Sequence, residues 1–296
     1  MQRHVFITGL QKSGTNLLVA LLERSGWATR VSEGMEGGPV WQRPDSIPTE
    51  GPGGVVYQRY KGERGHEFSG EDATLTMRWG IRRLMKKQLA RRPPGENQIS
   101  FNKNPYNSVR IPFLRTVFSD AVIVAVIRRP VPNCYSLLKI FQADNTYYPD
   151  PVEGWWGVKP SGWRDLVSDD KLVQLARQWV HVNKRMLTSG PDLVLWYHKL
   201  CADPGIALSS IWQLACDGSQ PQTSLPGKLY CCDDEPAITG STIMPKSRLW
   251  QGEGSLSLDS YEQGKPEFPP LTDNQLQTIT AITGDTEMWA QENYPG

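Results

Sequence analysis

Short apolar runs rich in β-branched residues recur along the chain, and longer amphipathic stretches separate them. The first run, Val5–Thr8, leads into a loop that contains Gly9 and Gly14, and an apolar, helix-forming stretch then extends to Leu22. Similar runs predict short strands at residues 28–31, 99–101, 121–127 and 193–197. Strands that alternate with helices are typical of parallel sheets. The pattern therefore predicts a single α/β domain over residues 1–296, with a central parallel sheet flanked by helices.

The amphipathic stretches predict the helices of this domain. Residues 71–92, 105–117, 130–141 and 172–187 are expected to be helical, and a last helix begins at Thr272 or Asp273. Asn104 and Pro105 are suited to the cap and the first turn of the second of these helices.

The predicted helix 71–92 has a ragged apolar stripe and a basic end. Its apolar positions, expected to face the core, are Leu75, Trp79, Leu84 and Leu89. Its basic residues are Arg82, Arg83, Lys86, Lys87, Arg91 and Arg92. We interpret this basic end as a solvated face, with a docking surface for an acidic partner as the alternative.

The loop between the first strand and the first helix has the features of an anion-binding site. Glycines let the backbone approach a ligand, successive N–H groups point inward, and the helix dipole favours negative charge. The sequence Gly9–Asn16 is close to the G-x-x-x-x-G-K-[ST] pattern but departs from it. Thr15 follows the second glycine where that pattern has lysine, and Lys12 lies inside the loop. We interpret this segment as a phosphate-binding loop.

The strand that would carry a magnesium ligand in a kinase or NTPase ends in cations instead. Such enzymes usually hold Mg²⁺ with an aspartate at the end of a second apolar strand. The candidate strand, residues 121–127, runs into Arg128, Arg129 and Pro130. We therefore expect no metal, and the pattern favours an anionic ligand bound by side-chain cations.

Three segments, in this order, carry a resemblance to a known family. The loop QKSGTNLL resembles the PKSGTTWL-type loop of sulfotransferases that use 3′-phosphoadenosine 5′-phosphosulfate. Arg128 precedes Ser136 by eight residues in RRPVPNCYS, the spacing of the family's second signature. Lys103 follows a strand, like a third family lysine. The similarity extends over about residues 5–136 and more loosely beyond, and it implies sulfuryl transfer to a hydroxyl or amine.

The resemblance assigns roles to residues near the phosphates. Lys12 would neutralise the leaving phosphate, and Lys103 would contact the sulfuryl group that moves. Arg128 and Ser136 would hold the 3′-phosphate of the donor, whose product is adenosine 3′,5′-bisphosphate.

In the C-terminal half the resemblance is looser. Tyr197 matches a tyrosine that meets the adenine in many relatives, although His198 and Lys199 depart from the residues that follow it there. Lys246 and Arg248 are the nearest match to a basic segment over the nucleotide. The donor-binding residues implied in total are Gln11, Lys12, Ser13, Gly14, Thr15, Asn16, Arg128, Ser136, Tyr197, Lys246 and Arg248.

A catalytic base is expected among carboxylates that follow the second strand. Glu33 lies nineteen residues after Gly14, at about the distance of the glutamate base in the tyrosylprotein and carbohydrate branches of the family. Glu36 and His66 are further candidates. Small-molecule members place a histidine base where this chain has Pro105, so a carboxylate is favoured.

Composition limits the partners. The net charge of +1 argues against general nucleic-acid binding. The 5 cysteines form no disulfide or metal pattern, and no long apolar run predicts a membrane span, so a cytoplasmic protein is expected. Long loops at residues 32–70 and 144–163, the second rich in aromatic residues, suit lids over a small-molecule, natural-product or sugar acceptor. The oligomeric state is left open.

Two other functions stay open at this point. One is a P-loop kinase with unusual metal ligands, which predicts binding of ATP with Mg²⁺. The other is a nucleotide-binding protein without turnover, which would bind the bisphosphate product and depend on no catalytic base.

Overall fold

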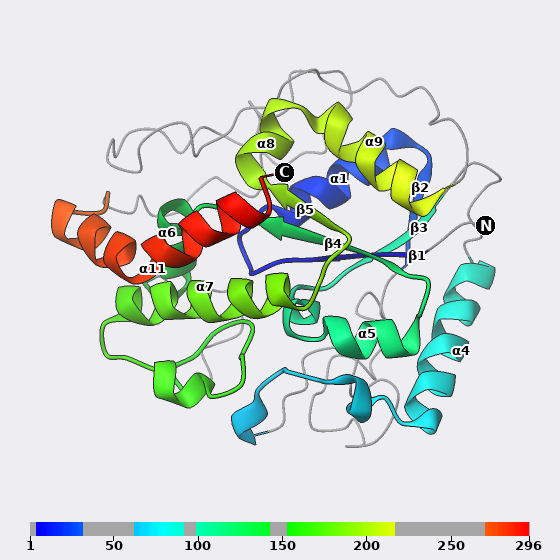
Figure 1. The fold of residues 1–296 in the computed structure, drawn as a ribbon, viewed down its shortest axis with the longest axis horizontal. Coiled ribbons are helices and arrows are strands. Elements are labelled where there is room, and N and C mark those ends of the chain that lie inside the picture. The colour runs from blue at the N-terminus through cyan, green and yellow to red at the C-terminus, as the bar shows by residue number, and fades with distance from the viewer. Residues whose placement is uncertain (1–3, 32–61, 92–98, 143–152, 217–269, 296) are drawn as a thin grey trace.

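The structure is a computed structural model, and it describes residues 4–31, 62–91, 99–142, 153–216 and 270–295. Its centre is a five-stranded sheet in the order β2-β3-β1-β4-β5, in which every neighbouring pair is parallel (Figure 1). The strands are β1 (His4–Thr8), β2 (Ala28–Arg30), β3 (Ile99–Lys103), β4 (Val122–Ile127) and β5 (Leu193–Trp196). The prediction of an α/β fold with a central parallel sheet is therefore confirmed.

Side chains alternate between the two faces of the sheet, and each face has its own hydrophobic core. Val5 and Ile7 of β1 pack on one face and Phe6 on the other. The first face is covered by α1 (Thr15–Ser25), α8 (Tyr197–Ala202) and α9 (Pro204–Ala215). The second is covered by α4 (Leu75–Arg91), α5 (Ile111–Val117), α6 (Pro130–Gln142), α7 (Lys171–Thr188) and α11 (Asp273–Asn293). In Figure 1, α1, α8 and α9 lie above the strands, and α5 and α7 lie below them.

Helix α4 buries a different stripe from the one that the sequence predicts. Met77 and Ile81 are buried against the core, whereas Leu75 is 77% exposed and Trp79 is 63% exposed. The buried pair is spaced by one turn and points toward α5, so the neighbouring helix decides which of two possible apolar rows faces inward. The expectation that Leu75 and Trp79 face the core is wrong.

The helix predicted over residues 105–117 is divided in two. Pro105–Val109 forms a short 3₁₀ helix, capped by the Asn104 side chain, which accepts a hydrogen bond of 3.0 Å from the Tyr106 N–H. Helix α5 then starts at Ile111, after Arg110 with φ −132°. Pro112 explains the break, because proline inside a continuous helix lacks the N–H and clashes with the preceding turn, whereas it fits the first turn of a new helix.

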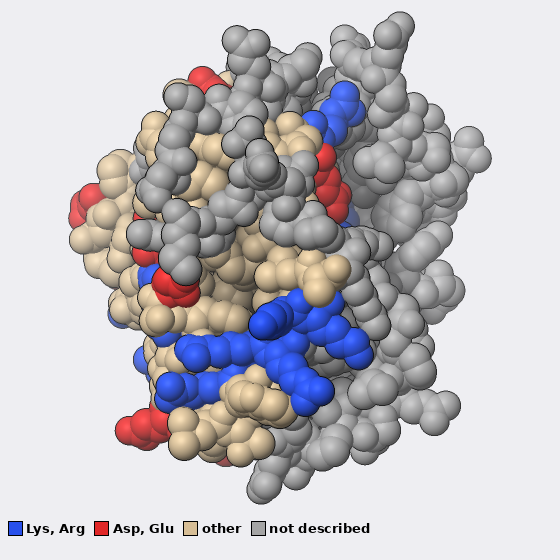
Figure 2. Space-filling view, turned by 90° about the vertical axis from the view of Figure 1, so that its right-hand side faces the viewer, with Lys and Arg blue, Asp and Glu red and all other residues tan. Residues whose placement is uncertain are grey.

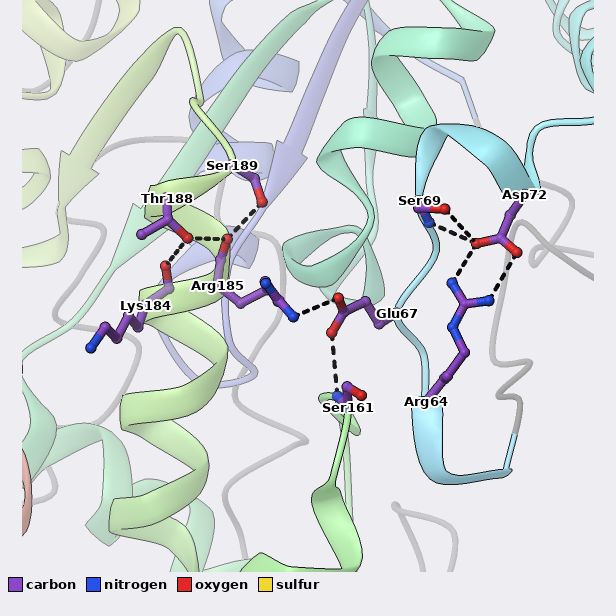
Figure 3. Close-up of polar contacts among 9 residues, drawn as sticks. All are labelled: Arg64, Glu67, Ser69, Asp72, Ser161, Lys184, Arg185, Thr188 and Ser189. Atoms are coloured by element: carbon purple, nitrogen blue, oxygen red, sulfur yellow. Dashed lines mark hydrogen bonds and ion pairs between the residues drawn. The ribbon is translucent and has the colours of Figure 1, made fainter.

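Ion pairs hold the segment 62–73 against α7 and the loop after residue 159 (Figure 3). The Glu67 carboxylate contacts Arg185 Nη2 at 2.8 Å and accepts a hydrogen bond from the Ser161 N–H at 3.4 Å. Arg64 donates twice to Asp72, at 2.6 and 3.1 Å. These partners come from three separate parts of the chain, so their contacts fix a long connection at the side of the sheet.

The last helix begins as predicted. Thr272 caps α11, with its hydroxyl accepting from the Gln275 N–H and the Gln275 side chain accepting from the Thr272 N–H. Within the described ranges, no helix has the length and apolar character needed to cross a membrane.

Candidate functional site

The loop Gly9–Gly14 joins β1 to α1 at the carboxyl edge of the sheet. A side chain on Gly9 would overlap the Val126 carbonyl oxygen, and one on Gly14 would overlap the ring of Tyr197. Gly14 has φ 103° and Lys12 has φ 66°, so the loop turns through two left-handed residues. No side chain caps the N-terminus of α1, and the Leu17 and Leu18 N–H groups donate to the Gly14 carbonyl at 2.9 and 3.2 Å, which leaves the N–H groups of Thr15 and Asn16 for a ligand.

The N–H groups in this loop are not all available to a ligand. The Ser13 N–H donates to the Leu10 carbonyl at 3.1 Å, which closes a turn. Thr15 and Asn16 start α1, and N–H groups in the first turn of a helix have no acceptor within the helix. The Ser13 hydroxyl is buried and has no hydrogen-bond partner among the described residues. The available donors are therefore those of the helix start and this hydroxyl.

Arg128, which directly follows β4, forms hydrogen bonds with both the Gly9–Gly14 loop and α6. Its Nη1 donates to the Lys12 carbonyl at 3.3 Å and to the Ser136 hydroxyl at 3.1 Å. The Arg128 carbonyl accepts from Trp179 Nε1 of α7 at 3.0 Å. The spacing of Arg128 and Ser136 along the chain thus becomes a direct contact, and the pair lies against the loop.

Tyr197 lies at the same place, at the start of α8 and directly after β5. Its ring packs against Gly14, and the Arg128 guanidinium carbon is 4.8 Å from the ring centroid. The sequence places Tyr197 in the strand, whereas β5 ends at Trp196. The structure brings together the loop, Arg128, Ser136 and Tyr197, which the sequence predicts as parts of one site.

Lys12 is the residue of this loop with the strongest electrostatic perturbation. Burial, and secondly the positive charge of Arg128, lower the pKa of the Lys12 ammonium group to about 8. Two cations beside each other create a positive potential that favours an anionic ligand.

Lys103 lies at the same edge of the sheet, because Lys103 of β3 pairs in register with Ile7 of β1. The Thr8 hydroxyl donates to the Asn104 carbonyl at 3.2 Å, and the Asn104 N–H donates to the Ile7 carbonyl at 3.1 Å. These bonds join the end of β1 to the segment that follows Lys103. The lysine is half-buried beside the start of the phosphate-binding loop.

Asn133, Gln178 and Trp179 contribute to the site but are not among the predicted residues. Asn133 Nδ2 donates to the Gln11 carbonyl at 3.0 Å. The Gln11 side chain accepts from the Val158 N–H at 3.3 Å, and Gln178 Nε2 donates to the Val158 carbonyl at 3.2 Å. Gln178 is one of three buried polar residues of α7, with Gln174 and Asn183, so no signal in the sequence singles it out.

These contacts attach part of the aromatic insertion to the loop. Residues 153–163 of the predicted segment 144–163 are described. Trp155 and Trp163 are buried against each other and Leu166 in a small core of their own. The two tryptophan rings therefore form the interior of the insertion. The hydrogen bond from the Val158 N–H to the Gln11 side chain joins the insertion to the loop between β1 and α1.

His66, one of the candidate bases, is buried in a network of backbone contacts. Its Nδ1 accepts from the Lys159 N–H at 2.7 Å, and its carbonyl accepts from Arg110 Nε at 2.7 Å. A neutral imidazole that accepts at Nδ1 carries its proton on Nε2, so no ring lone pair is left to accept another proton. This arrangement favours a structural role for His66.

Four predicted site residues, Glu33, Glu36, Lys246 and Arg248, lie outside the described residues. The described chain before Glu33 ends at Val31. There the Val31 N–H donates to the Phe101 carbonyl at 2.7 Å, and Asn102 Nδ2 donates to the Val31 carbonyl at 2.9 Å. In the described ranges, no cluster of His, Cys, Asp and Glu side chains could hold a metal ion.

A central parallel sheet with a glycine-containing loop between its first strand and the helix that follows places the chain in a class of α/β proteins. Within that class, the sequence profile described as "Sulfotransferase family" matches residues 4–213. The chain belongs to this family. The match extends from β1 through α9, and so includes the loop, Arg128, Ser136 and Tyr197. No curated protein matches the sequence.

Several solved structures are similar to the chain, among them three sulfotransferases. Sulfotransferase STF1 from Mycobacterium tuberculosis H37Rv is 17% identical, with a TM-score of 0.38 over 72% of this chain and 67% of that one. Sulfotransferase STF9 from Mycobacterium avium is 16% identical, with a TM-score of 0.45 over 96% and 76%. A sulfotransferase from Alicyclobacillus acidocaldarius is 13% identical, with a TM-score of 0.41 over 76% and 86%. The family assignment rests on the sequence profile and not on these structures.

Proposed function

We propose that this sulfotransferase moves the sulfuryl group of 3′-phosphoadenosine 5′-phosphosulfate to a hydroxyl or amine of a small-molecule, natural-product or sugar acceptor. The observation that carries the proposal is the contact of one guanidinium, that of Arg128, with both the Lys12 carbonyl and the Ser136 hydroxyl. This guanidinium lies between the phosphate-binding loop and α6. It is therefore suited to a nucleotide with two separate phosphate positions.

The described residues fit such a nucleotide in charge and in hydrogen bonding. Lys12 and Arg128 supply positive charge, and burial first and the Arg128 charge second lower the pKa of Lys12 to about 8. The buried Ser13 hydroxyl has no partner in the described part of the chain, so a phosphate oxygen would satisfy it. Tyr197, whose ring packs against Gly14 and beside the Arg128 guanidinium, would contact the adenine.

The roles of the residues follow from charge. Sulfuryl transfer leaves a phosphate behind, and by analogy with phosphoryl transfer the protein contributes mainly positioning and electrostatic stabilisation. Lys12 would neutralise the charge that grows on the leaving phosphate, and Lys103 would hold the moving group. Arg128 and Ser136 would bind the 3′-phosphate, the group that separates this donor from ATP. Lys246 and Arg248 are proposed to complete the nucleotide site.

A carboxylate would accept the proton of the acceptor. Glu33 is our first candidate and Glu36 the second. His66 follows them, because its Nδ1 already accepts a hydrogen bond from the Lys159 backbone. We also propose that residues 1–296 form one domain whose segments 32–70 and 144–163 border the acceptor. The bond from the Val158 N–H to Gln11 supports a position of the second segment beside the donor loop.

The cellular compartment is proposed from the cysteines. Cys134, Cys201 and Cys216 are free thiols in the described residues. Free thiols are usual in the reducing cytoplasm, so we place the activity there.

Two alternatives remain to be separated from this proposal. A kinase would place a carboxylate at the end of β4 for Mg²⁺, and this chain has Arg128 at that position. A binding protein without turnover would need only the residues that hold the nucleotide. Lys103, which we assign to the sulfuryl group, would have no role in such a protein.

Calorimetric titration with adenosine 3′,5′-bisphosphate, adenosine 5′-phosphate and ATP with Mg²⁺ distinguishes these functions. We expect tight binding only when the 3′-phosphate is present, and loss of that preference in Arg128→Ala. Preference for ATP with Mg²⁺ would replace the proposal with the kinase. Bisphosphate binding, combined with no sulfate transfer to any of a broad set of hydroxyl and amine acceptors, would support the binding protein.

A further inference from the structure

The outer side of α4 concentrates positive charge that the proposed chemistry does not use. Every charged residue between Leu75 and Arg91 is Lys or Arg. The whole chain has a net charge of only +1, so the rest of the chain contains more acidic than basic residues. A segregated charge of this kind on one helix marks a surface that attracts an acidic partner.

This surface also has apolar character and a hollow. Leu75, Arg78, Trp79, Arg82, Arg83 and Lys86 line a surface hollow of about 420 Å³, and we call these six residues the α4 face. Figure 2 shows basic side chains gathered in one patch on this side of the molecule, next to uncharged surface. Leu75 and Trp79 are 77% and 63% exposed, which is unusual for large apolar side chains.

Two arginines of the α4 face, Arg82 and Arg83, are held in place by contacts. Arg82 Nε donates to the Val117 carbonyl at 2.6 Å, and the Arg83 guanidinium carbon lies 5.1 Å from the centroid of the Trp79 ring. Arg78 Nε is buried and donates to no described residue. Among the described residues, none of these three arginines forms an ion pair. Ordered guanidinium groups lose little further entropy when they bind carboxylates.

We propose that the α4 face docks an acidic, amphipathic segment of a partner protein. Arg78, Arg82 and Lys86 follow one another by one helical turn each, so they form a row about 12 Å long. Carboxylates one turn apart on an acidic helix repeat at a similar spacing and match this row. Leu75 and Trp79 then accept an apolar side chain of the partner, as aromatic and arginine residues do in many interfaces.

Other anionic partners fit the face less well. A membrane-surface helix inserts a continuous apolar face, whereas here two exposed apolar side chains, Leu75 and Trp79, lie at one end of the helix. Nucleic acid is usually bound by a basic surface that follows its backbone, and this cluster is confined to one helix. A protein segment with both carboxylates and an apolar side chain uses all parts of the face.

The α4 face is separate from the nucleotide site. In Figure 1 the arrowheads of β4 and β5 point to the left, toward the carboxyl edge with the phosphate-binding loop, while α4 lies at the right. Docking of the partner can therefore be tested independently of nucleotide binding. A negative result for the docking surface does not contradict the proposed function, and the reverse also holds.

The test measures binding of a fluorescein-labelled helical peptide, with Glu on one face and Leu on the other, by fluorescence anisotropy. The full chain is compared with Arg83→Glu/Lys86→Glu and with Trp79→Ala. The double variant Arg177→Glu/Lys184→Glu on α7 is the matched control, because it changes the net charge equally. We expect at least tenfold weaker binding in both α4 variants and little change in the control, with bisphosphate affinity equal in all four proteins.

Three outcomes overturn the proposal. One is an equal loss in the α7 control, which would mean that only net charge matters. Another is equal binding of a peptide with Gln in place of every Glu. The third is failure of the acidic peptide to bind, whether or not phosphatidylserine vesicles or a DNA duplex bind through the same arginines.

Discussion

The charge on Lys12 makes anion binding depend on pH. Burial and the Arg128 guanidinium lower the pKa of this ammonium group to about 8 in the free protein. A bound phosphate stabilises the charged amine, so the complex keeps its proton to higher pH than the free protein does. Adenosine 3′,5′-bisphosphate should therefore bind with uptake of a proton as the pH passes about 8.

The size of the effect follows from the fraction of free protein in which Lys12 is charged. With a pKa of about 8 and a complex protonated throughout, affinity falls roughly 25-fold between about pH 7.5 and about pH 9.5. Below about pH 7.5 the affinity changes little, because most molecules already carry the charge. The phosphates of the ligand have a second pKa of about 6, so the ligand charge is constant across this range.

Calorimetry in two buffers of different ionisation enthalpy measures both the affinity and the proton uptake. Lys12→Arg is the matched control, because arginine stays charged at every pH of the series. We expect a flat affinity and no proton uptake in this variant. An equal decline in both proteins would assign the titration to another group at the site, such as Lys103 or the Tyr197 hydroxyl, and would refute the argument for Lys12.

Three further substitutions test the site. Lys12→Ala should keep the fold and lose about two to three powers of ten in turnover, because one preorganised cation is removed. Circular dichroism checks the fold. Near-normal turnover of the folded variant would contradict the mechanism. Ser136→Ala should weaken bisphosphate binding about tenfold in calorimetry, since a hydrogen bond to a charged group is lost, and should leave the affinity for adenosine 5′-phosphate unchanged. An equal loss of affinity for both ligands would place Ser136 away from the 3′-phosphate. Gly14→Ala should destabilise the protein by about 1–3 kcal/mol in urea unfolding, because φ is 103° and the Cβ meets Tyr197; unchanged stability would mean that the loop adapts.

The sequence predicts well the features that depend on neighbours in the chain. The alternation in Val5–Thr8 and the run at residues 121–127 are sufficient to predict buried strands, and both are present. The contact of Arg128 with Ser136 follows from their spacing, since a strand end and the helix after it keep a fixed relation. The cap at Thr272 is equally local.

Features that depend on distant parts of the chain could not be predicted. The contact of Tyr197 with Gly14 joins the ends of β5 and β1, which lie on either side of β4. The bond from Asn133 to the Gln11 carbonyl requires α6 to lie beside the loop. In α4, two apolar rows were possible, and only packing against α5 selects Met77 and Ile81 over Leu75 and Trp79.

The positive charge of Lys12 has a cost in stability. A pKa of about 8, against an ordinary value of 10.5, corresponds to roughly 3 kcal/mol by which the folded protein disfavours the charged Lys12. This cost is complete below about pH 8, and stability is regained as the pH rises from about 8 toward 10.5, because the unfolded chain then holds the proton and the folded chain does not. A lysine kept at this cost agrees with the proposed function, in which a highly charged donor binds beside Lys12 and Arg128 and stabilises the charged ammonium group.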